Sequence, residues 1–386
     1  MQNFDISIAS CADYSETEVN RALDEALSAI GGLDWVEAGM TVAIKANLVM
    51  FLKPERAATT HPSLLCALVK RLRDRGAEVV LGDSPGGLYN ATYVGRVYAA
   101  TGMHLVEQAG AKLNDDYSQV TVDYPSAKIA KRLTYTAYLD TADAIINFCN
   151  LKSHGMMGMS AAAKNMFGVV PGTMKPEYHF LYPDSNDFAD MLIDINEYFK
   201  DKMRLTIVDA VVGMEGNGPT QGTPRKIGAV LAGVNPHKLD LACASIIGAA
   251  TDSIPTLSAA VRRGIVPESV ADVAISGDLS RYIVPDFERV DASAAKLSFG
   301  GDSAFAKLRG KLLSAALSSK PKLKTSECVG CNECGKICPA KAIVINKKGK
   351  AVIERKKCIK CFCCQEFCPK GAMKVGRTFI AKLLNK

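Results

Sequence analysis

Two closely matching cysteine motifs near the C-terminus constrain this chain more than any other feature. Residues 328–339 read CVGCNECGKICP, and residues 358–369 read CIKCFCCQEFCP. A shift of thirty positions places four cysteines and one proline of the first motif on those of the second. Each copy has the spacing C-x2-C-x2-C-x3-C-P, so this part of the chain is an internal duplication.

The spacing predicts two 4Fe–4S clusters. Three thiolates separated by two residues each can bind three corners of one iron–sulfur cube, and the fourth cysteine points away toward the other cube. Pro339 and Pro369 fix the backbone after each fourth cysteine and donate no N–H. The expected ligands are Cys328, Cys331, Cys334 and Cys368 for the first cluster, and Cys338, Cys358, Cys361 and Cys364 for the second.

Disulfide bonds and zinc are the alternative uses of these cysteines. Disulfides need an oxidising compartment, whereas the opening residues MQNFDISIAS lack the basic and apolar regions of a secretory signal. Zinc sites use C-x2-C pairs with a longer spacer between them. We therefore expect clusters, in a protein of the reducing cytoplasm.

Residues 326–375 resemble the bacterial two-cluster ferredoxins. Between the motifs the sequence alternates around Lys348 and Gly349, which predicts a hairpin over Ala342–Glu354. Cys363 is a ninth cysteine in this module. It is interpreted as a bystander thiol, with a substitute ligand or a redox-labile site as the alternative.

Charge is distributed unevenly along the 386 residues, whose net charge is +7. From Phe305 to Lys386 the balance is +16, and the preceding residues carry −9. Two oxidised clusters with their thiolates add about −4, which the C-terminal lysines offset. The same lysines can form a docking face for an acidic redox protein such as a ferredoxin or flavodoxin. Nucleic-acid binding is the alternative, but interleaved aromatic residues are missing.

Hydrophobic periodicity predicts an α/β body over residues 1–317, with a mostly parallel sheet flanked by helices. The module then forms a small α+β domain after a polar linker over residues 318–325, and residues 376–386 form a tail. No run of eighteen apolar residues occurs, so no membrane span is expected. Strands are expected at 4–10, 41–46, 77–83, 120–124, 133–138, 144–148, 205–212 and 227–232. Helices are expected at 16–30, 62–75, 94–109, 185–199, 238–248 and 311–318, with a short amphipathic one in the tail.

Polar residues follow four of the predicted strands, where ligands bind in open α/β sheets. Together they predict one cleft, although each group alone is typical of solvated loops and turns. The candidate catalytic residues are Lys152, His154, Lys164 and Asp83. The candidate substrate-binding residues are Lys45, Asn47, Ser84, Gly86, Gly87, Asn165, Asp209, Glu215 and Asn217.

The chemistry of these residues favours an anionic ligand. Neither glycine-rich loop matches a nucleotide-binding fingerprint, but lysines beside backbone N–H groups suit a carboxylate or phosphate. His154 is a possible proton donor or a structural histidine. Asp83 and Asp209 are possible bases, metal ligands or strand-end caps. The methionines between 156 and 166 fit packing better than metal binding.

A set of motifs in the body resembles the domain-of-unknown-function family 362. The motifs are KAN (45–47), DSPGG (83–87), LKSHG (151–155), AAAKNMFG (161–168) and DAVVGMEGNGPTQGTP (209–224). The resemblance extends over about Val42–Asp240. It implies one α/β body with a C-terminal two-cluster ferredoxin module, and it brings no established reaction.

Three hypotheses follow. In the first, a redox enzyme receives electrons at the basic module and passes them through two clusters to a ligand held by Lys45, Lys152 and Lys164. In the second, the chain is an electron-transfer adaptor whose body docks a partner enzyme. In the third, the clusters are purely structural.

Overall fold

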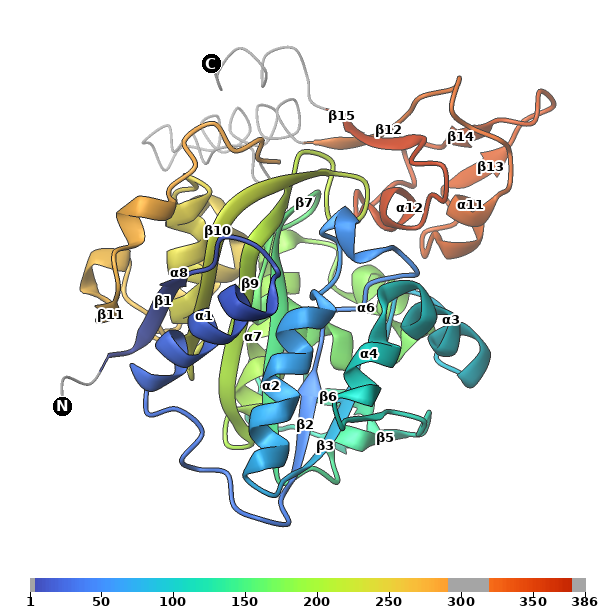
Figure 1. Cartoon of the computed structure of the whole chain (residues 1–386). Coiled ribbons are helices and arrows are strands. Elements are labelled where there is room, and N and C mark those ends of the chain that lie inside the picture. Colours follow the sequence, from blue (N-terminus) through green and yellow to red (C-terminus); the bar gives the residue numbers. More distant parts are fainter. Residues whose placement is uncertain (1–3, 291–318, 377–386) are drawn as a thin grey trace.

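The computed structural model describes residues 4–290 and 319–376 (Figure 1). The helices expected at 311–318 and in the tail after 376 lie outside the described residues. Among the residues described, no helix is long and apolar enough to cross a membrane.

A mixed, mostly parallel sheet forms the centre of the body and confirms the predicted fold class. Its strands are β1 (Ile6–Ser10), β2 (Thr41–Lys45), β3 (Glu78–Gly82), β4 (Lys112–Leu113), β7 (Ala144–His154), β8 (Gly158–Ser160), β9 (Met203–Glu215), β10 (Thr223–Gly233) and β11 (Ile275–Ser276). The order is β11-β1-β10-β9-β7-β2-β3-β4, and β8 pairs with β7. Strands β9, β7, β2, β3 and β4 are parallel to one another, whereas β10 is antiparallel to both of its neighbours.

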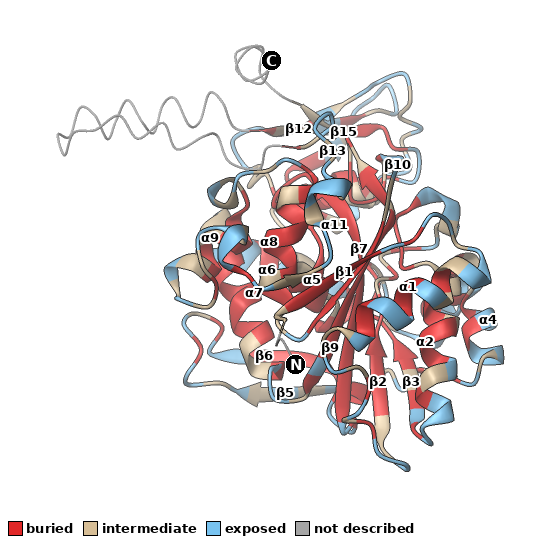
Figure 2. Ribbon diagram, turned by 60° about the vertical axis from the view of Figure 1, so that its left-hand side comes forward, coloured by how far each residue is buried: buried red, intermediate tan, exposed pale blue. Residues whose placement is uncertain are grey.

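Helices cover both faces of this sheet (Figure 2). Alternation along β2 sends Val42 and Ile44 to one face and Ala43 to the other, so two separate apolar cores form. The first core is completed by α1 (Glu16–Ser28), α2 (Pro62–Asp74), α3 (Ala91–Thr101) and α4 (Met103–Gln108). The second is completed by α5 (Ala162–Asn165), α6 (Lys175–Leu181), α7 (Ser185–Phe199), α8 (Pro236–Ile246) and α9 (Pro255–Arg262).

Three local differences from the expected elements have physical causes. The helix expected over 94–109 is two helices, because Gly102 adopts a left-handed φ of 76° and ends α3. Strands β7 and β9 run several residues further than expected because they stay paired as far as Lys152 and Met214. The hairpin of β5 (Gln119–Asp123) and β6 (Arg132–Thr136) forms a sheet of its own.

The C-terminal module is a small domain with two short antiparallel sheets. One sheet pairs β12 (Lys320–Leu323) with β15 (Met373–Gly376), so a strand lies within the residues expected to form a linker. The other pairs β13 (Ile343–Ile345) with β14 (Ala351–Ile353) at the predicted hairpin. Each cysteine motif contains one short helix, α11 (Glu333–Ile337) in the first and α12 (Cys363–Glu366) in the second.

Short 3-10 turns connect the remaining segments. They are η1 (Pro54–Arg56), η2 (Ala137–Leu139), η3 (Met166–Val169), η4 (Gly172–Met174), η5 (Thr251–Ser253), η6 (Val270–Asp272) and η7 (Leu279–Tyr282). The module lies beyond the carboxyl ends of β7 and β9, where the body loop 215–221 contacts it (Figure 1).

Candidate functional site

A cavity of about 70 Å³ lies between the body and the module. Its body side comes from the ends of β2, β3 and β7 and from the segments around α5 and α6. Its module side is α12 with the residue that follows it. The lining residues with polar or aromatic side chains are Asn47, Asp83, Ser84, Lys152, Ser160, Lys164, Asn165, Phe167, Lys175, His179, Cys363, Glu366 and Phe367.

Most of the candidate residues from the first three strand ends meet at this cavity. Gly86 also lines it, and Lys45 lies immediately behind the lining. The parallel order β7-β2-β3 explains the convergence, because the carboxyl ends of adjacent parallel strands lie at the same edge of the sheet.

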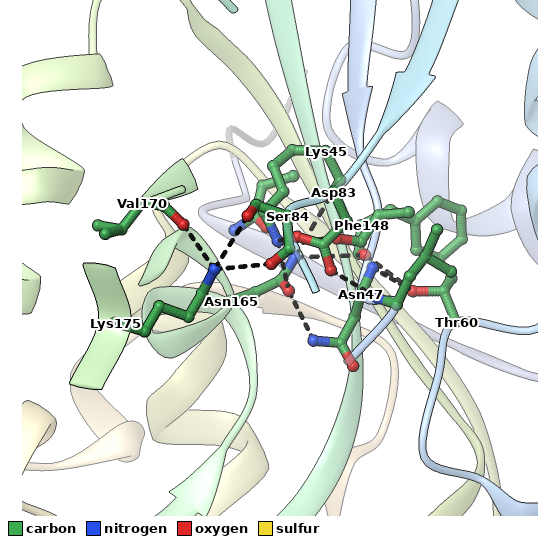
Figure 3. Close-up of polar contacts among 12 residues, drawn as sticks. Lys45, Asn47, Thr60, Asp83, Ser84, Phe148, Asn165, Val170 and Lys175 are labelled. Carbon is green, nitrogen blue, oxygen red and sulfur yellow. Dashed lines mark hydrogen bonds and ion pairs between the residues drawn. The ribbon is translucent and has the colours of Figure 1, made fainter. Parts of the chain in front are cut away.

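An ion pair between Lys45 and Asp83 forms the floor of the site (Figure 3). Lys45 Nζ lies 2.9 Å from Asp83 Oδ1 and also donates to Asn165 Oδ1 at 3.0 Å. Burial lowers the pKa of Lys45, and the carboxylate of Asp83 opposes that shift. A Cβ on Gly168 would lie 2.3 Å from both charged groups, so only glycine fits there.

Lys152 and Lys175 reach the cavity with uncharged partners alone. Lys152 Nζ donates to the side-chain oxygen of Asn47 and, at 2.7 Å, to the carbonyl of Ala58. Lys175 Nζ donates to the carbonyls of Ser84 at 2.7 Å and Val170 at 2.5 Å (Figure 3). Burial lowers the pKa of each lysine to about 7, and Lys164 and Lys45 add repulsion. Among the residues that the structure describes, these ammonium groups therefore form no ion pair.

Lys164 and His179 line the cavity and have polar atoms that make no hydrogen bond to the described residues. Within the described part of the chain, the Lys164 ammonium makes no hydrogen bond and lies 5.6 Å from the centre of the Phe167 ring. His179 stacks on Phe188 with ring centroids 4.4 Å apart, and its Nδ1 has no partner among the described residues. Burial lowers the pKa of His179 to about 3, so its imidazole is neutral.

His154 faces the module rather than the cavity. Its Nδ1 accepts the backbone N–H groups of Met156 at 3.1 Å and Met157 at 3.2 Å, so the proton of the neutral ring lies on Nε2. Nε2 lies 3.1 Å from Oε1 of Glu366, which does line the cavity. Burial and the charge of Lys164 lower the pKa of His154 to about 4. His154 is therefore positioned to orient the Glu366 carboxylate.

Glu366 is the one carboxylate that the module contributes to the lining. Burial alone would raise its pKa, but the contact with His154 and the charge of Lys164 lower it to about 2. Glu366 is therefore ionised.

The loop 215–221 fixes the module in place through main-chain contacts. Gln365 Nε2 donates to the carbonyl of Asn217 at 2.8 Å, and Val375 N donates to Asn217 Oδ1 at 2.9 Å. Gln221 Nε2 donates to the carbonyl of Cys368 at 3.3 Å. Asn217, a candidate ligand-binding residue, is thus placed at the interface between the two domains.

Asp209 and Glu215 lie outside the cavity lining. Both oxygens of Asp209 accept from Tyr14 Oη, at 3.0 and 3.2 Å, and burial raises the pKa of Asp209 to about 6. Glu215 lies 3.7 Å from Arg225. Gly87 also lies outside the lining and packs against Gly172, where a Cβ would meet the Gly87 carbonyl at 2.0 Å. The geometry gives these three residues structural partners.

The cysteine motifs enclose a second cavity, of about 20 Å³, inside the module. It is lined by all four cysteines assigned to the first cluster, together with apolar side chains such as Leu323, Ile345 and Met373. The fourth cysteines of both motifs accept backbone N–H groups at sulfur, Cys338 from Ala342 at 3.2 Å and Cys368 from Ala372 at 3.1 Å. A pocket of thiols with apolar neighbours and N–H donors fits an iron–sulfur cluster.

The lining residues that the sequence analysis missed include Lys175, His179, Cys363 (as a lining residue), Glu366 and Phe367. Lys175 and His179 lie on α6, which follows no strand and carries no motif. The three module residues reach the site only through the docking of the two domains. Cys363 was noticed as an extra thiol, and its lack of a counterpart in the first motif was the available signal.

Comparison with known proteins gives matches for both parts of the chain. A curated relative, "Thylakoid-associated protein sll1697" from Synechocystis sp., is 28% identical over 303 residues, which are 76% of this chain and 90% of that protein. Two solved structures match with TM-scores of 0.36 and 0.35, a protein from Thermotoga maritima (10% identity) and the lactate racemase apoprotein from Thermoanaerobacterium thermosaccharolyticum (15% identity). Their matches include 56% and 58% of this chain, which spans only 55% and 54% of those chains.

Family comparison identifies the two domains. Residues 320–369 match the 4Fe-4S dicluster domain, so the module holds two 4Fe–4S clusters. Residues 42–245, more than half of the chain, match the family described as "Domain of unknown function (DUF362)". The chain therefore belongs to the DUF362 family and combines its body with a 4Fe–4S dicluster domain.

Proposed function

We propose that this protein is a redox enzyme that delivers electrons from its dicluster domain to a small anion bound in the cavity between the two domains. When bound, the clusters supply one-electron carriers. The observation that carries the proposal is the position of α12. Its residues Cys363 and Glu366 line the cavity, and Cys364 of the same helix is an expected ligand of the second cluster.

The exposure of the two motifs supports a direction of electron transfer through the module, from the first motif to the second. Cys331, in the first motif, is exposed, and its neighbour Val329 keeps 61% of its surface accessible. Cys361 and Cys364, in the second motif, are buried beside the body. The first motif therefore offers the contact with an external electron carrier, and the second offers the contact with the cavity.

The lysines account for the binding of an anion. Among the described residues, Lys152 and Lys175 have uncharged hydrogen-bonding partners and Lys164 makes no hydrogen bond, so the cavity is an electropositive site. The Lys45–Asp83 pair holds Asn165 and the strand ends in place below it. Among the candidate catalytic residues, Lys152 and Lys164 contact the bound molecule, and His154 acts through Glu366.

Anaerobic turnover measurements test this proposal. Holoprotein with both clusters reduced is mixed with a panel of small carboxylates and oxyanions, and cluster reoxidation is followed by absorbance. We expect a few anions to reoxidise the wild type, and the Lys164→Gln variant to be at least about tenfold slower because a charged hydrogen bond is lost. Reoxidation by redox proteins alone, with every small anion inert, would contradict the proposal.

An electron-transfer adaptor is the second candidate, and the exposed basic residues favour it. Arg355, Lys356 and Lys357 are exposed on the module and can meet an acidic redox protein such as a ferredoxin or flavodoxin. In an adaptor, reversing these three charges abolishes reduction of the partner, while Lys152→Ala and Lys164→Ala leave it intact. Loss of function in the two cavity variants, with relay retained after the charge reversal, would favour the enzyme.

We propose a cytoplasmic location for this activity, because cluster cysteines need reducing conditions. Association with a membrane surface is the alternative that the name of the Synechocystis relative suggests. Fractionation of cells at low and high salt distinguishes the two locations.

A further inference from the structure

We infer that the cavity ligand is a small dianion, which Lys164 and His179 contact directly while Lys152 and Lys175 supply the remaining positive charge. This inference rests on the proposed function of the cavity as an anion site and specifies the class of molecule that it takes.

The charges around the cavity carry the first part of the inference. Four lysines and two carboxylates surround the space: Lys45, Lys152, Lys164, Lys175, Asp83 and Glu366. Lys45 and Asp83 neutralise each other at 2.9 Å. Glu366 offsets one of the other three lysines, so two positive charges remain when all three are protonated. Since buried charge is costly without compensation, a ligand with two negative charges fits this surplus.

The unused hydrogen-bonding groups carry the second part. Lys175 directs its ammonium to Ser84 and Val170, and Lys152 directs two of its N–H groups to Asn47 and Ala58. The Lys164 ammonium, in contrast, has no hydrogen-bonding partner in the described part of the chain. His179 Nδ1 is buried and has no partner there. A buried polar group of this kind is nearly always satisfied in a functional state, and the half-buried Lys164 has N–H groups left to donate. These two groups therefore await the ligand.

The size of the space and its walls carry the third part. At about 70 Å³ the cavity holds a compact molecule. The Phe167 and Phe367 rings exclude water from its sides, which strengthens the attraction between the lysines and an anion. A singly charged anion of the same size would leave one lysine charge uncompensated, so it should bind more weakly.

Titration calorimetry of the oxidised holoprotein with sulfate and perchlorate tests the inference. Sulfate is a dianion at neutral pH, and perchlorate is a monoanion with the same tetrahedral arrangement of four oxygens. We expect sulfate to bind at least about tenfold more tightly than perchlorate at constant ionic strength. Equal affinities, or tighter binding of perchlorate, would overturn the inference, and no variant is needed for this comparison.

Two variants locate the binding. Lys164→Gln and His179→Phe should each weaken sulfate binding by about tenfold or more, since each removes a direct hydrogen bond to a charged ligand. Lys200→Gln is the matched control, because Lys200 is exposed at the end of α7 and pairs with Glu197 at 3.2 Å. Retained cluster absorbance shows that each variant is folded. Unchanged sulfate affinity in folded Lys164→Gln would overturn the assignment.

The experiment separates this inference from the proposed enzyme activity. Sulfate binding is measured with oxidised clusters and involves no electron transfer. Tight sulfate binding together with no reoxidation by any small anion would leave the dianion site standing while contradicting the redox enzyme. Reoxidation by monoanions alone would support the redox enzyme while contradicting the dianion site.

Discussion

The two cysteine motifs share one spacing but lie in different environments. The comparison shows which residues of a motif serve its cluster and which serve its contacts with the rest of the protein. The ligand positions and the following proline are identical in both copies. Around the ligands, Val329, Asn332 and Lys336 of the first motif are exposed, whereas Phe362, Cys363 and Gln365 of the second are buried. Five of the seven residues that differ in the second motif touch the body or line the cavity.

The substitutions between the second and fourth cysteines of each motif lie on the docking surface. These five pairs, first motif before second, are Asn332 and Phe362, Glu333 and Cys363, Gly335 and Gln365, Lys336 and Glu366, and Ile337 and Phe367. In the first motif, Glu333 and Lys336 form a surface ion pair at 2.7 Å. In the second, the equivalents of both line the cavity. At these two positions the first copy therefore has a surface ion pair, and the second copy has cavity-lining side chains.

The backbone is the same in both copies although the side chains differ. Asn332 and Phe362 precede their helices with left-handed φ angles of 62° and 63°. Asparagine adopts this conformation at little cost, whereas a phenylalanine in it is strained. Phe362 is 3% exposed and packs in the core of the body beside Gly155, so its burial offsets the backbone strain.

The largest expected effect comes from removing one ligand of each cluster. Cys331→Ala and Cys361→Ala should each lower the iron content from about eight to about four atoms per chain, because one cluster is lost. After chemical reduction, Cys331→Ala should still be reoxidised by the cavity ligand, whereas Cys361→Ala should not. Iron analysis with anaerobic absorbance traces measures both. If Cys331→Ala were the one that failed, the order of the two clusters would be the reverse.

The next effect concerns the position with the left-handed backbone. Phe362→Ala should destabilise the protein by about 2–4 kcal/mol, since the lost burial of a phenylalanine exceeds the relieved strain. Asn332→Ala, at the exposed equivalent, should cost about 1 kcal/mol or less. Chemical denaturation under nitrogen measures both values. Similar losses for the two variants would show that docking contributes little to stability.

A smaller effect is expected where the body meets Phe367. A Cβ on Gly86 would lie 2.5 Å from the tip of the Phe367 ring, so Gly86→Ala should cost about 1–3 kcal/mol and slow cavity-dependent reoxidation. Gly95→Ala is the control, because a Cβ on Gly95 in α3 has no neighbour within 4 Å. It should raise stability by about 0.5–1 kcal/mol. Thermal melting and reoxidation rates test the pair, and a stable, fully active Gly86→Ala would show that Phe367 does not seal the cavity.

The last effect is a pH dependence of sulfate binding in the cavity. Lys152, which faces Lys45, Lys164 and Asp83, and Lys175, which faces these and Glu366, have pKa values of about 7. An anion favours their charged forms, so sulfate affinity should be highest below pH 7 and fall above it. The fall should be about tenfold per pH unit for each lysine that takes up a proton. Calorimetry between pH 6 and 9 checks the sign; affinity that rises with pH would contradict it.

The clusters and the parallel sheet could be predicted from the sequence because both follow from local sequence patterns. Cysteine spacing determines the clusters, and alternating strand and helix patterns determine the parallel sheet, so three strand ends with Lys45, Asp83 and Lys152 meet at one edge. Strand-end position was not sufficient for Asp209, because a wide sheet edge also has room for structural groups such as Tyr14.

The other wall of the site could not be predicted from local patterns. Glu366 reaches Lys164 only because Gln365, Gln221 and Asn217 dock the two domains through hydrogen bonds between residues about 150 positions apart. No periodicity encodes such a contact. The difference between the two motifs was visible in the sequence, and its meaning required the structure.

A pocket with walls from two domains limits how this protein can be recombined. Replacing the module by a foreign two-cluster ferredoxin would keep an electron supply, but the chimaera would have a shallow open surface where the α12 wall had stood. In this chain the ferredoxin is thus no interchangeable accessory. It supplies one wall of the cavity, through Cys363, Glu366 and Phe367.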